Sequence, residues 1–141
     1  MKIIEWDGDR KKLLSVLWIY LTVNYIYCDV FTLHLAPYLE AFLSGDVGGM
    51  KITEEFLLMF AFIMQVPVIM IVLSRLLTFR LNKYFNVVAG IFTTSVQAFT
   101  LTMGGSTLHY KFFSILEIGT GILIIYLAIT WKQKSPHSEP E

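Results

Sequence analysis

The 141-residue sequence is short of cysteine and of charge. Its single cysteine, Cys28, excludes an intrachain disulfide and a zinc site built from cysteines. Charged residues make up only 16 % of the chain, with 11 basic and 11 acidic side chains, so no overall field indicates a nucleic-acid partner. The chain also lacks a nucleophile motif, a phosphate-binding loop and a metal-ligand set. Chemistries that need those devices are not expected, and neither is a cofactor.

Apolar residues are what the sequence has in excess. The hydrophobic fraction is 55 %, the aromatic fraction 15 % and the mean hydropathy +0.62, well above the usual values for a soluble domain. A membrane span needs about 20 predominantly apolar residues, and four segments qualify: 13–35, 56–77, 84–103 and 112–131. The sequence therefore predicts an all-α integral membrane protein, a four-helix antiparallel bundle in one domain over residues 1–134.

The segments between the spans predict smaller features. After the first span, apolar and aromatic side chains follow Pro37 at helical spacing and predict a short interfacial helix. Three glycines then turn the chain, and Thr53 is predicted to begin the second span. Residues 135–141 are polar, contain two prolines and are predicted to form a disordered cytoplasmic tail.

Basic residues lie mostly on one side of the predicted bundle. Nine lysines and arginines fall on the side that holds both termini, against Lys51 and Lys111 on the other. Lysine and arginine are enriched in cytoplasmic connections. We therefore expect both termini in the cytoplasm and the chain as a multi-pass protein of the bilayer.

Each predicted span contributes a strongly polar side chain to one layer of the membrane. With a rise of ~1.5 Å per residue, Asp29 lies roughly 7 Å outward of the membrane midplane, Glu117 lies at about the same depth, Gln97 lies roughly 5 Å outward, and Gln65 lies close to the midplane. A carboxylate that faces lipid costs about 2.5–3.5 kcal/mol. We expect Asp29 and Glu117 to face the bundle interior, a water-filled cavity or a partner subunit.

Helical spacing adds further residues to this set. Tyr25 shares a face of the first span with Asp29, and Asn86 begins a stripe of polar and small residues that reaches Gln97 at steps of three and four. Helix packing explains the small residues of this stripe better than a pathway does. Pro67 should kink the second span. The predicted ligand-binding residues are Asp29, Glu117, Gln97, Gln65, Tyr25 and Asn86, with Asp29 and Glu117 also the candidates for catalysis.

Two histidines near the outer end of the bundle are weak candidates for a metal or haem site. His34 and His109 are the residues concerned, but nothing else in the chain supplies ligand spacing. No metal site is predicted, and both are interpreted as interfacial side chains. Cys28 is interpreted as a small core residue.

Five segments carry a resemblance to a known family. They are N-Y-I-Y-C-D-V-F-T-L at 24–33, I-T-E-E-F-L-L at 52–58, M-Q-V-P-V-I-M-I-V-L-S-R at 64–75, R-L-N-K-Y-F-N-V-V-A-G at 80–90 and F-F-S-I-L-E-I at 112–118. Together, and in this order, they resemble small four-span bacterial membrane proteins of unknown function. The likeness covers all four spans. In architecture alone the chain is also loosely similar to the DoxX-like four-span proteins.

The resemblance implies a four-helix membrane bundle and brings no activity with it. It marks five matching positions, which are Asp29, Pro67, Arg75, Asn86 and Glu117. It also implies that relatives often have an acid where this chain has Gln65. That departure weakens any mechanism that requires a third carboxyl group.

Two carboxyls at membrane depth lead to three hypotheses. The first is a protein of the bacterial inner (plasma) membrane that binds or transports a small organic molecule, for which an acid beside aromatic rings suits a cation. The second is an intramembrane acid–base enzyme, of isomerase or cyclase type, acting on a lipid-like substrate. The third is a structural or regulatory subunit whose acids pair helices. A homo-oligomer is expected because four helices seldom enclose a polar cavity alone.

Overall fold

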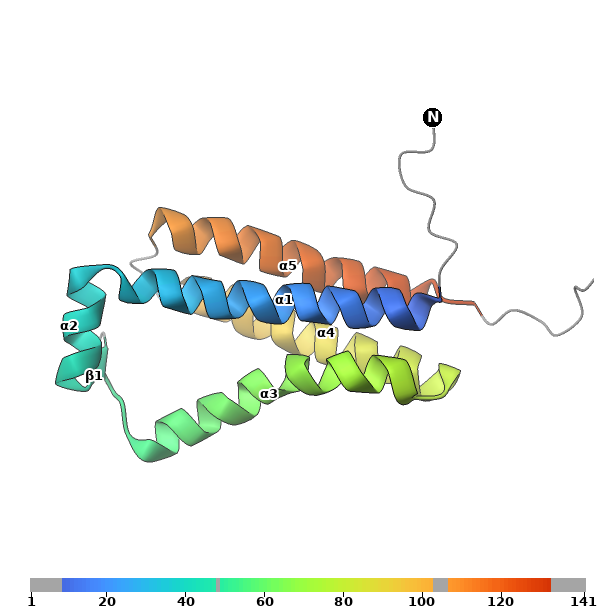
Figure 1. The fold of residues 1–141 in the computed structure, drawn as a ribbon, viewed down its shortest axis with the longest axis horizontal. Helices are drawn as coiled ribbons and strands as arrows, with labels where there is room; N and C mark the ends of the chain where they lie inside the picture. Colours follow the sequence, from blue (N-terminus) through green and yellow to red (C-terminus); the bar gives the residue numbers. More distant parts are fainter. Residues whose placement is uncertain (1–8, 48, 103–106, 133–141) are drawn as a thin grey trace, which may run out of the picture.

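The computed structural model describes residues 9–47, 49–102 and 107–132 (Figure 1). The predicted tail at 135–141 and most of the glycine-led connection before the fourth span lie outside these residues. The elements are α1 (Arg10–Leu33), α2 (Ala36–Ser44), β1 (Asp46–Val47), β2 (Met50–Lys51), α3 (Glu54–Leu76), α4 (Phe79–Thr102) and α5 (Leu108–Ile129). Four of them, α1, α3, α4 and α5, are long and apolar enough to cross a membrane. The predicted all-α, four-span architecture is confirmed.

Side chains at the helix starts explain why the spans begin where they do. The Asp9 carboxylate accepts a hydrogen bond from the backbone N–H two residues later, at the start of α1. The hydroxyls of Thr53 and Thr107 accept from the N–H groups three residues later, at the starts of α3 and α5. Such caps satisfy N–H groups that have no partner within the helix. The predicted start of the second span at Thr53 is confirmed.

The predicted short helix after the first span is α2. It has Pro37 in its first turn, where a missing N–H costs nothing, and it ends at Gly45, whose φ of +72° suits glycine. A two-stranded antiparallel hairpin follows, with Asp46 opposite Lys51. The Asp46 carboxylate accepts a hydrogen bond of 2.8 Å from the N–H of Gly49. The sequence predicted only a turn at this point.

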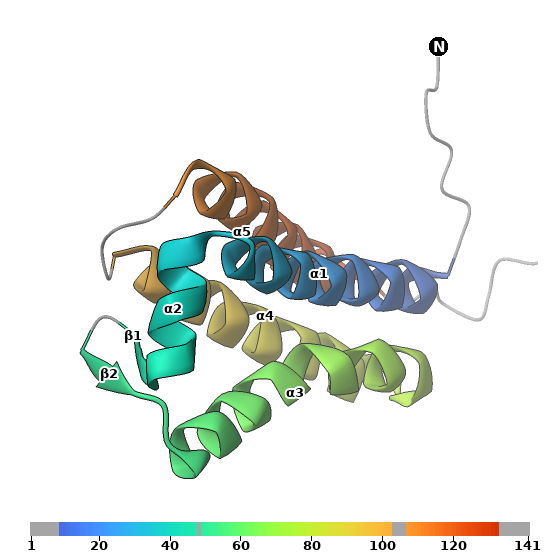
Figure 2. The same ribbon diagram turned by 60° about the vertical axis from the view of Figure 1, so that its left-hand side comes forward.

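The two ends of the bundle differ, and Figure 2 shows the contrast. We call the end that carries α2, β1 and β2 the hairpin end, and the opposite end, where α1 and α4 begin and α3 and α5 finish, the basic end. Helices α1, α4 and α5 run alongside one another, whereas α3 changes direction about halfway along and moves away from them toward the hairpin end (Figures 1 and 2). All the buried residues of α3, which are Pro67, Met70 and Ser74, lie in its second half.

The apolar core lies toward the basic end. It is formed by Leu14, Trp18, Leu21, Met70, Ala89 and Ile124. A polar network joins three helices beside it. The Asn86 carbonyl oxygen on α4 accepts from Trp18 Nε1 at 2.7 Å and from the Ser74 hydroxyl at 3.2 Å, and the Asn86 amide donates to Asn82 Oδ1 at 2.6 Å. Both hydrogen-bonding groups of this buried amide are therefore satisfied, which favours one arrangement of α1, α3 and α4.

The last turn of α5 is capped by cations from two other helices. Arg10 Nη1 donates to the Leu127 carbonyl at 2.8 Å and to the Thr130 hydroxyl at 3.1 Å, and Lys83 Nζ donates to the Ile129 carbonyl at 2.7 Å. The last carbonyls of a helix have no partner within it, and a positive charge there is stabilising. These contacts hold the basic end of the bundle together.

Replacing Arg10 with alanine is expected to lower the free energy of unfolding by about 1 kcal/mol, because a charged donor to the end of α5 is lost. Denaturant unfolding of the detergent-solubilised protein measures this change. Lys12→Ala is the matched control, because Lys12 is an exposed cation in the same turn of α1. An equal loss of stability in both variants would show that the capping contact contributes nothing of its own.

Candidate functional site

The most unusual side chain in the bundle is that of Glu117. It lies on α5 and is only 2 % exposed. Neither of its carboxyl oxygens has a hydrogen-bond partner among the residues that the structure describes. Buried polar groups are almost always paired, and an isolated buried carboxylate is very unfavourable. The position therefore requires a ligand, an ion, water or a bound proton.

The groups close enough for their charges to act on Glu117 come from two helices. Helix α1 supplies Tyr25, Cys28 and Asp29, and α5 itself supplies Tyr110. The set contains two phenols, a thiol and a second carboxyl group, and no cation. The site therefore suits a positively charged guest.

Asp29 lies on the side of α1 that faces α3. Ser15, Thr22 and Asp29 recur every seven residues, which places them along one side of the helix. The Ser15 hydroxyl donates to the Ile71 carbonyl on α3 at 2.8 Å, so this side of α1 is turned toward α3. At the level of Asp29, however, α3 has already left the bundle, and Asp29 is exposed.

Contacts at both ends of α1 and α5 fix the relative depth of the two acids. Thr32 on α1 meets His109 on α5 at 3.2 Å near the hairpin end, and Arg10 caps α5 at the basic end. This alignment puts Glu117 about two helical turns, roughly 10 Å, deeper toward the basic end than Asp29. The sequence predicted equal depth, because it assumed that the centres of the spans coincide. The two acids form a series along the bundle, one exposed and one buried.

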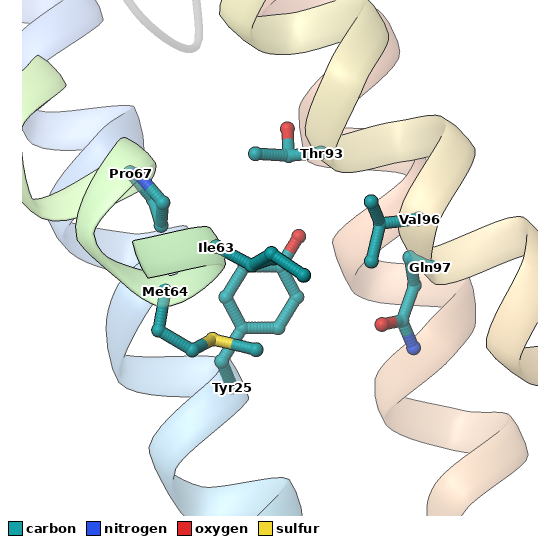
Figure 3. Close-up of a pocket in the computed structure, with 7 residues that line it drawn as sticks. All are labelled: Tyr25, Ile63, Met64, Pro67, Thr93, Val96 and Gln97. Atoms are coloured by element: carbon teal, nitrogen blue, oxygen red, sulfur yellow. The ribbon is translucent and has the colours of Figure 1, made fainter. Parts of the chain in front are cut away.

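A small pocket lies where α3 separates from α1 and α4. Its volume is about 20 Å³, enough for one water molecule. Figure 3 shows the Tyr25 ring between the two walls, with its hydroxyl pointing toward Thr93. Pro67 cannot donate the usual helical hydrogen bond to the Ile63 carbonyl, and both residues line the pocket. The full lining is Tyr25, Ile63, Met64, Pro67, Thr93, Val96 and Gln97.

Gln97 connects this pocket to the helix that carries Glu117. Its Nε2 donates to the Ser114 hydroxyl on α5 at 2.9 Å, and Ser114 lies one turn before Glu117 on the same side of α5. The Gln97 carbonyl oxygen points toward the Tyr25 side of the pocket (Figure 3). Tyr25 and Gln97 therefore lie between the pocket and the buried acid.

The structure brings four of the six predicted ligand-binding residues together. Tyr25 and Gln97 line the pocket, and Asp29 and Glu117 lie near Tyr25. Gln65 is exposed and is not among the lining residues. Asn86 is fully engaged in the network near the basic end. The roles assigned to these residues in ligand binding stay predictions.

Sequence reasoning missed part of the pocket wall. Thr93 carried a signal, since it belongs to the stripe between Asn86 and Gln97, but the stripe was interpreted as packing. The apolar lining residues Ile63, Met64 and Val96 carried no signal except that two of them lie within one turn of Pro67.

The two histidines have different hydrogen-bond partners. His34 Nδ1 bonds to the Val30 carbonyl at 2.7 Å, whereas His109 bonds to the hydroxyls of Thr32 and Thr107. Within the described part of the chain, no group of three or more His, Cys, Asp or Glu side chains could hold a metal ion. Cys28 is buried, with a free thiol.

Four apolar helices that enclose buried polar side chains define a multi-pass membrane protein. The chain belongs to a family of unknown function, DUF6326, whose sequence pattern matches residues 1–138. This confirms the resemblance drawn from the five segments. No curated protein and no solved structure matches the chain.

Proposed function

We propose that this protein binds a small organic cation within the membrane and exchanges it for a proton at Glu117, either as a binding protein or as a transporter. The observation that carries the proposal is the burial of Glu117 without a partner for either oxygen. A lone carboxylate is costly at membrane depth. Glu117 is therefore stable either with a proton or beside a cation, and one replaces the other.

The side chains around Glu117 favour a cationic ligand. Tyr25 and Tyr110 place aromatic rings near it, and aromatic faces attract organic cations. Asp29 supplies a second carboxyl group, about two helical turns nearer the hairpin end than Glu117. A cation would meet the exposed acid first and the buried acid second.

The pocket has room for no more than one water molecule, so a larger ligand requires movement of a helix. The first half of α3 can provide it, because none of its side chains is buried. Its second half is fixed, since Ser74 donates to Asn86 and the Ser74 carbonyl accepts from Asn82. Pro67 lies between the two halves and weakens the helix where they meet.

The orientation and assembly of the protein belong to the same proposal. Arg75, Arg80 and Lys83 lie at the basic end, with Arg10 to Lys12. This distribution supports a cytoplasmic position for that end and for both termini, in the bacterial inner membrane. We also propose that the protein is a homo-oligomer.

Proton release on cation binding tests the role of Glu117. Addition of tetraphenylphosphonium, a lipophilic organic cation, to the purified protein in weakly buffered detergent should release about one proton per bound cation. Glu117→Gln should abolish the release, because the amide has no exchangeable charge. Glu40→Gln is the matched control, since Glu40 is an exposed glutamate on α2. Binding without release in the wild type, or equal release from Glu117→Gln, would contradict the proposal.

A second candidate is acid–base catalysis on a lipid-like substrate. It is favoured by one observation: the two carboxyls lie in different environments, one exposed and one buried, and such differences separate an acid from a base. Under this hypothesis Glu117→Gln still binds its ligand but no longer converts it, so mass spectrometry of captured compounds distinguishes the two functions.

A further inference from the structure

The first half of α3, residues 54–66, is only partly covered. None of its side chains is buried. Phe56, Phe60, Ile63 and Met64, on the side of the helix that continues to Pro67 and the pocket, are half-buried, and Leu57, Leu58 and Phe62 on its other sides are 56 %, 59 % and 70 % exposed. The segment diverges from α1 in both views of the fold (Figures 1 and 2). We call the surface formed by the half-buried side of this segment together with the exposed Asp29 on α1 the lateral opening. The pocket lies at its inner end.

We propose that the ligand is a single-chain cationic amphiphile that enters from the bilayer through the lateral opening, with its head group beside Asp29 and its alkyl chain along the first half of α3. This inference rests on the proposed function, because it names the ligand class and the entry route of the same site.

Charge determines the head group. Asp29 stands among exposed apolar neighbours on α1, with Ile26 57 % exposed and Val30 42 % exposed. A carboxylate in such surroundings is unfavourable if nothing compensates its charge. A cationic head group compensates it, whereas an anionic one adds repulsion and a neutral one leaves the cost in place.

The apolar surfaces determine the rest of the molecule. The first half of α3 is about 20 Å long by its helical rise, which is enough to accompany a long alkyl chain. Most of the pocket lining beyond it is apolar too, with Ile63, Met64, Pro67 and Val96 contributing. A water-borne cation would gain nothing from either surface, whereas an amphiphile already dissolved in the bilayer meets both.

The order of contacts gives the path. A head group that enters at Asp29 meets Tyr25 one turn deeper on α1, and Tyr25 lines the pocket. Glu117 lies beyond Tyr25 and Gln97. Asp29 therefore selects a cationic head group, and Glu117 binds that head group once the proton on Glu117 has left.

Capture by nanodiscs of phosphatidylcholine tests the inference. Discs with wild-type protein should retain more dodecyltrimethylammonium than empty discs, and they should retain no extra tetramethylammonium, which lacks the chain, and no extra dodecyl sulfate, which has the opposite charge. Asp29→Asn should weaken the capture about tenfold. Asp29→Glu keeps the charge and should restore it. Asp46→Asn is the control, because Asp46 is an exposed aspartate of the hairpin.

Three results would overturn the inference. They are equal capture by wild type and Asp29→Asn, capture of tetramethylammonium as strong as that of the long-chain cation, and a change of oligomeric state in Asp29→Asn without loss of capture, which would mean that a second copy covers Asp29. Proton release by tetraphenylphosphonium separates the two proposals. If that release persists while dodecyltrimethylammonium is not captured, the lateral entry is wrong and the exchange at Glu117 stands.

Discussion

Replacing Asn86 with leucine is expected to lower the free energy of unfolding by about 3 kcal/mol. Four hydrogen bonds are lost, one from Trp18, one from Ser74 and two to Asn82, at its backbone carbonyl and at Oδ1, and each is worth about 0.5–1 kcal/mol. The Trp18 indole N–H is left buried without an acceptor, because Trp18 is fully buried. Denaturant or thermal unfolding in detergent measures the effect.

Asn24→Leu is the matched control for this prediction. Asn24 is also a buried amide, but among the described residues its side chain donates only to the Tyr20 carbonyl, within its own helix. It joins no other helix, so its loss should cost less than half as much. If the two variants lose the same stability, the network adds nothing to the packing of α1, α3 and α4. If Asn86→Leu loses ligand capture without losing stability, Asn86 belongs to the ligand site, as the sequence predicted.

The length of the apolar runs was enough to predict the four spans, because a run of about 20 apolar residues has one stable form in a bilayer. Local sequence signals predicted α2 and the Thr53 cap. Periodicity within the spans gave the polar faces. The sequence did not predict the β1–β2 hairpin, since two residues per strand leave no periodic signal. It predicted a kink at Pro67 but not its consequence, because the separation of α3 depends on what α1 and α4 present to it.

The candidate site, too, could be predicted from the sequence only in part. The spacing of Tyr25 and Asp29, and of Gln97 within its stripe, gave the face of each helix. It could not give the neighbour of that face or the alignment between helices. Gln65 was included because of its depth, but it is exposed on the side of α3 that faces away from the pocket, which its neighbours Ile63, Met64 and Pro67 line. Asn86 and Gln97 lie on one stripe of α4. Asn86, however, accepts hydrogen bonds from Trp18 and Ser74 and therefore belongs to the network that joins the helices.

The bundle thus combines a fixed half and an open half. At the basic end, the core, the Asn86 network and the cations on α5 hold all four spans. Toward the hairpin end, α3 is only partly covered, and the two acids and the pocket lie there or at the boundary. Regions with few buried contacts open at low free-energy cost. A binding site for a membrane-dissolved ligand needs such a region beside a rigid one.

Replacing Gly121 with leucine is expected to cost about 3 kcal/mol or more, because α4 and α5 approach each other closely at this residue. A Cβ added at Gly121 would collide with Thr94 Oγ1, and it would lie 3.4 Å from Thr94 Cβ and 3.9 Å from the Gly90 carbonyl oxygen. Rotation of Thr94 can make room for one methyl group but not for a branched side chain beside the α4 backbone. The variant should also disturb Glu117, which lies one turn earlier on α5. Unfolding in detergent measures the first effect, and proton release by tetraphenylphosphonium measures the second.

Gly119→Leu provides the control on the same helix. A Cβ at Gly119 meets no atom within 4 Å, and leucine is a better helix former than glycine by up to about 1 kcal/mol, so this variant should be as stable as the wild type or more so. Gly121→Ala should cost less than Gly121→Leu, because Thr94 can rotate, and Thr94→Ala should lower that cost further, since it removes the colliding oxygen, which has no hydrogen-bond partner among the residues described. Equal stability of the two leucine variants would mean that α4 and α5 are not packed through Gly121. The buried position of Glu117, which depends on that packing, would then have to be abandoned together with the proton exchange built on it.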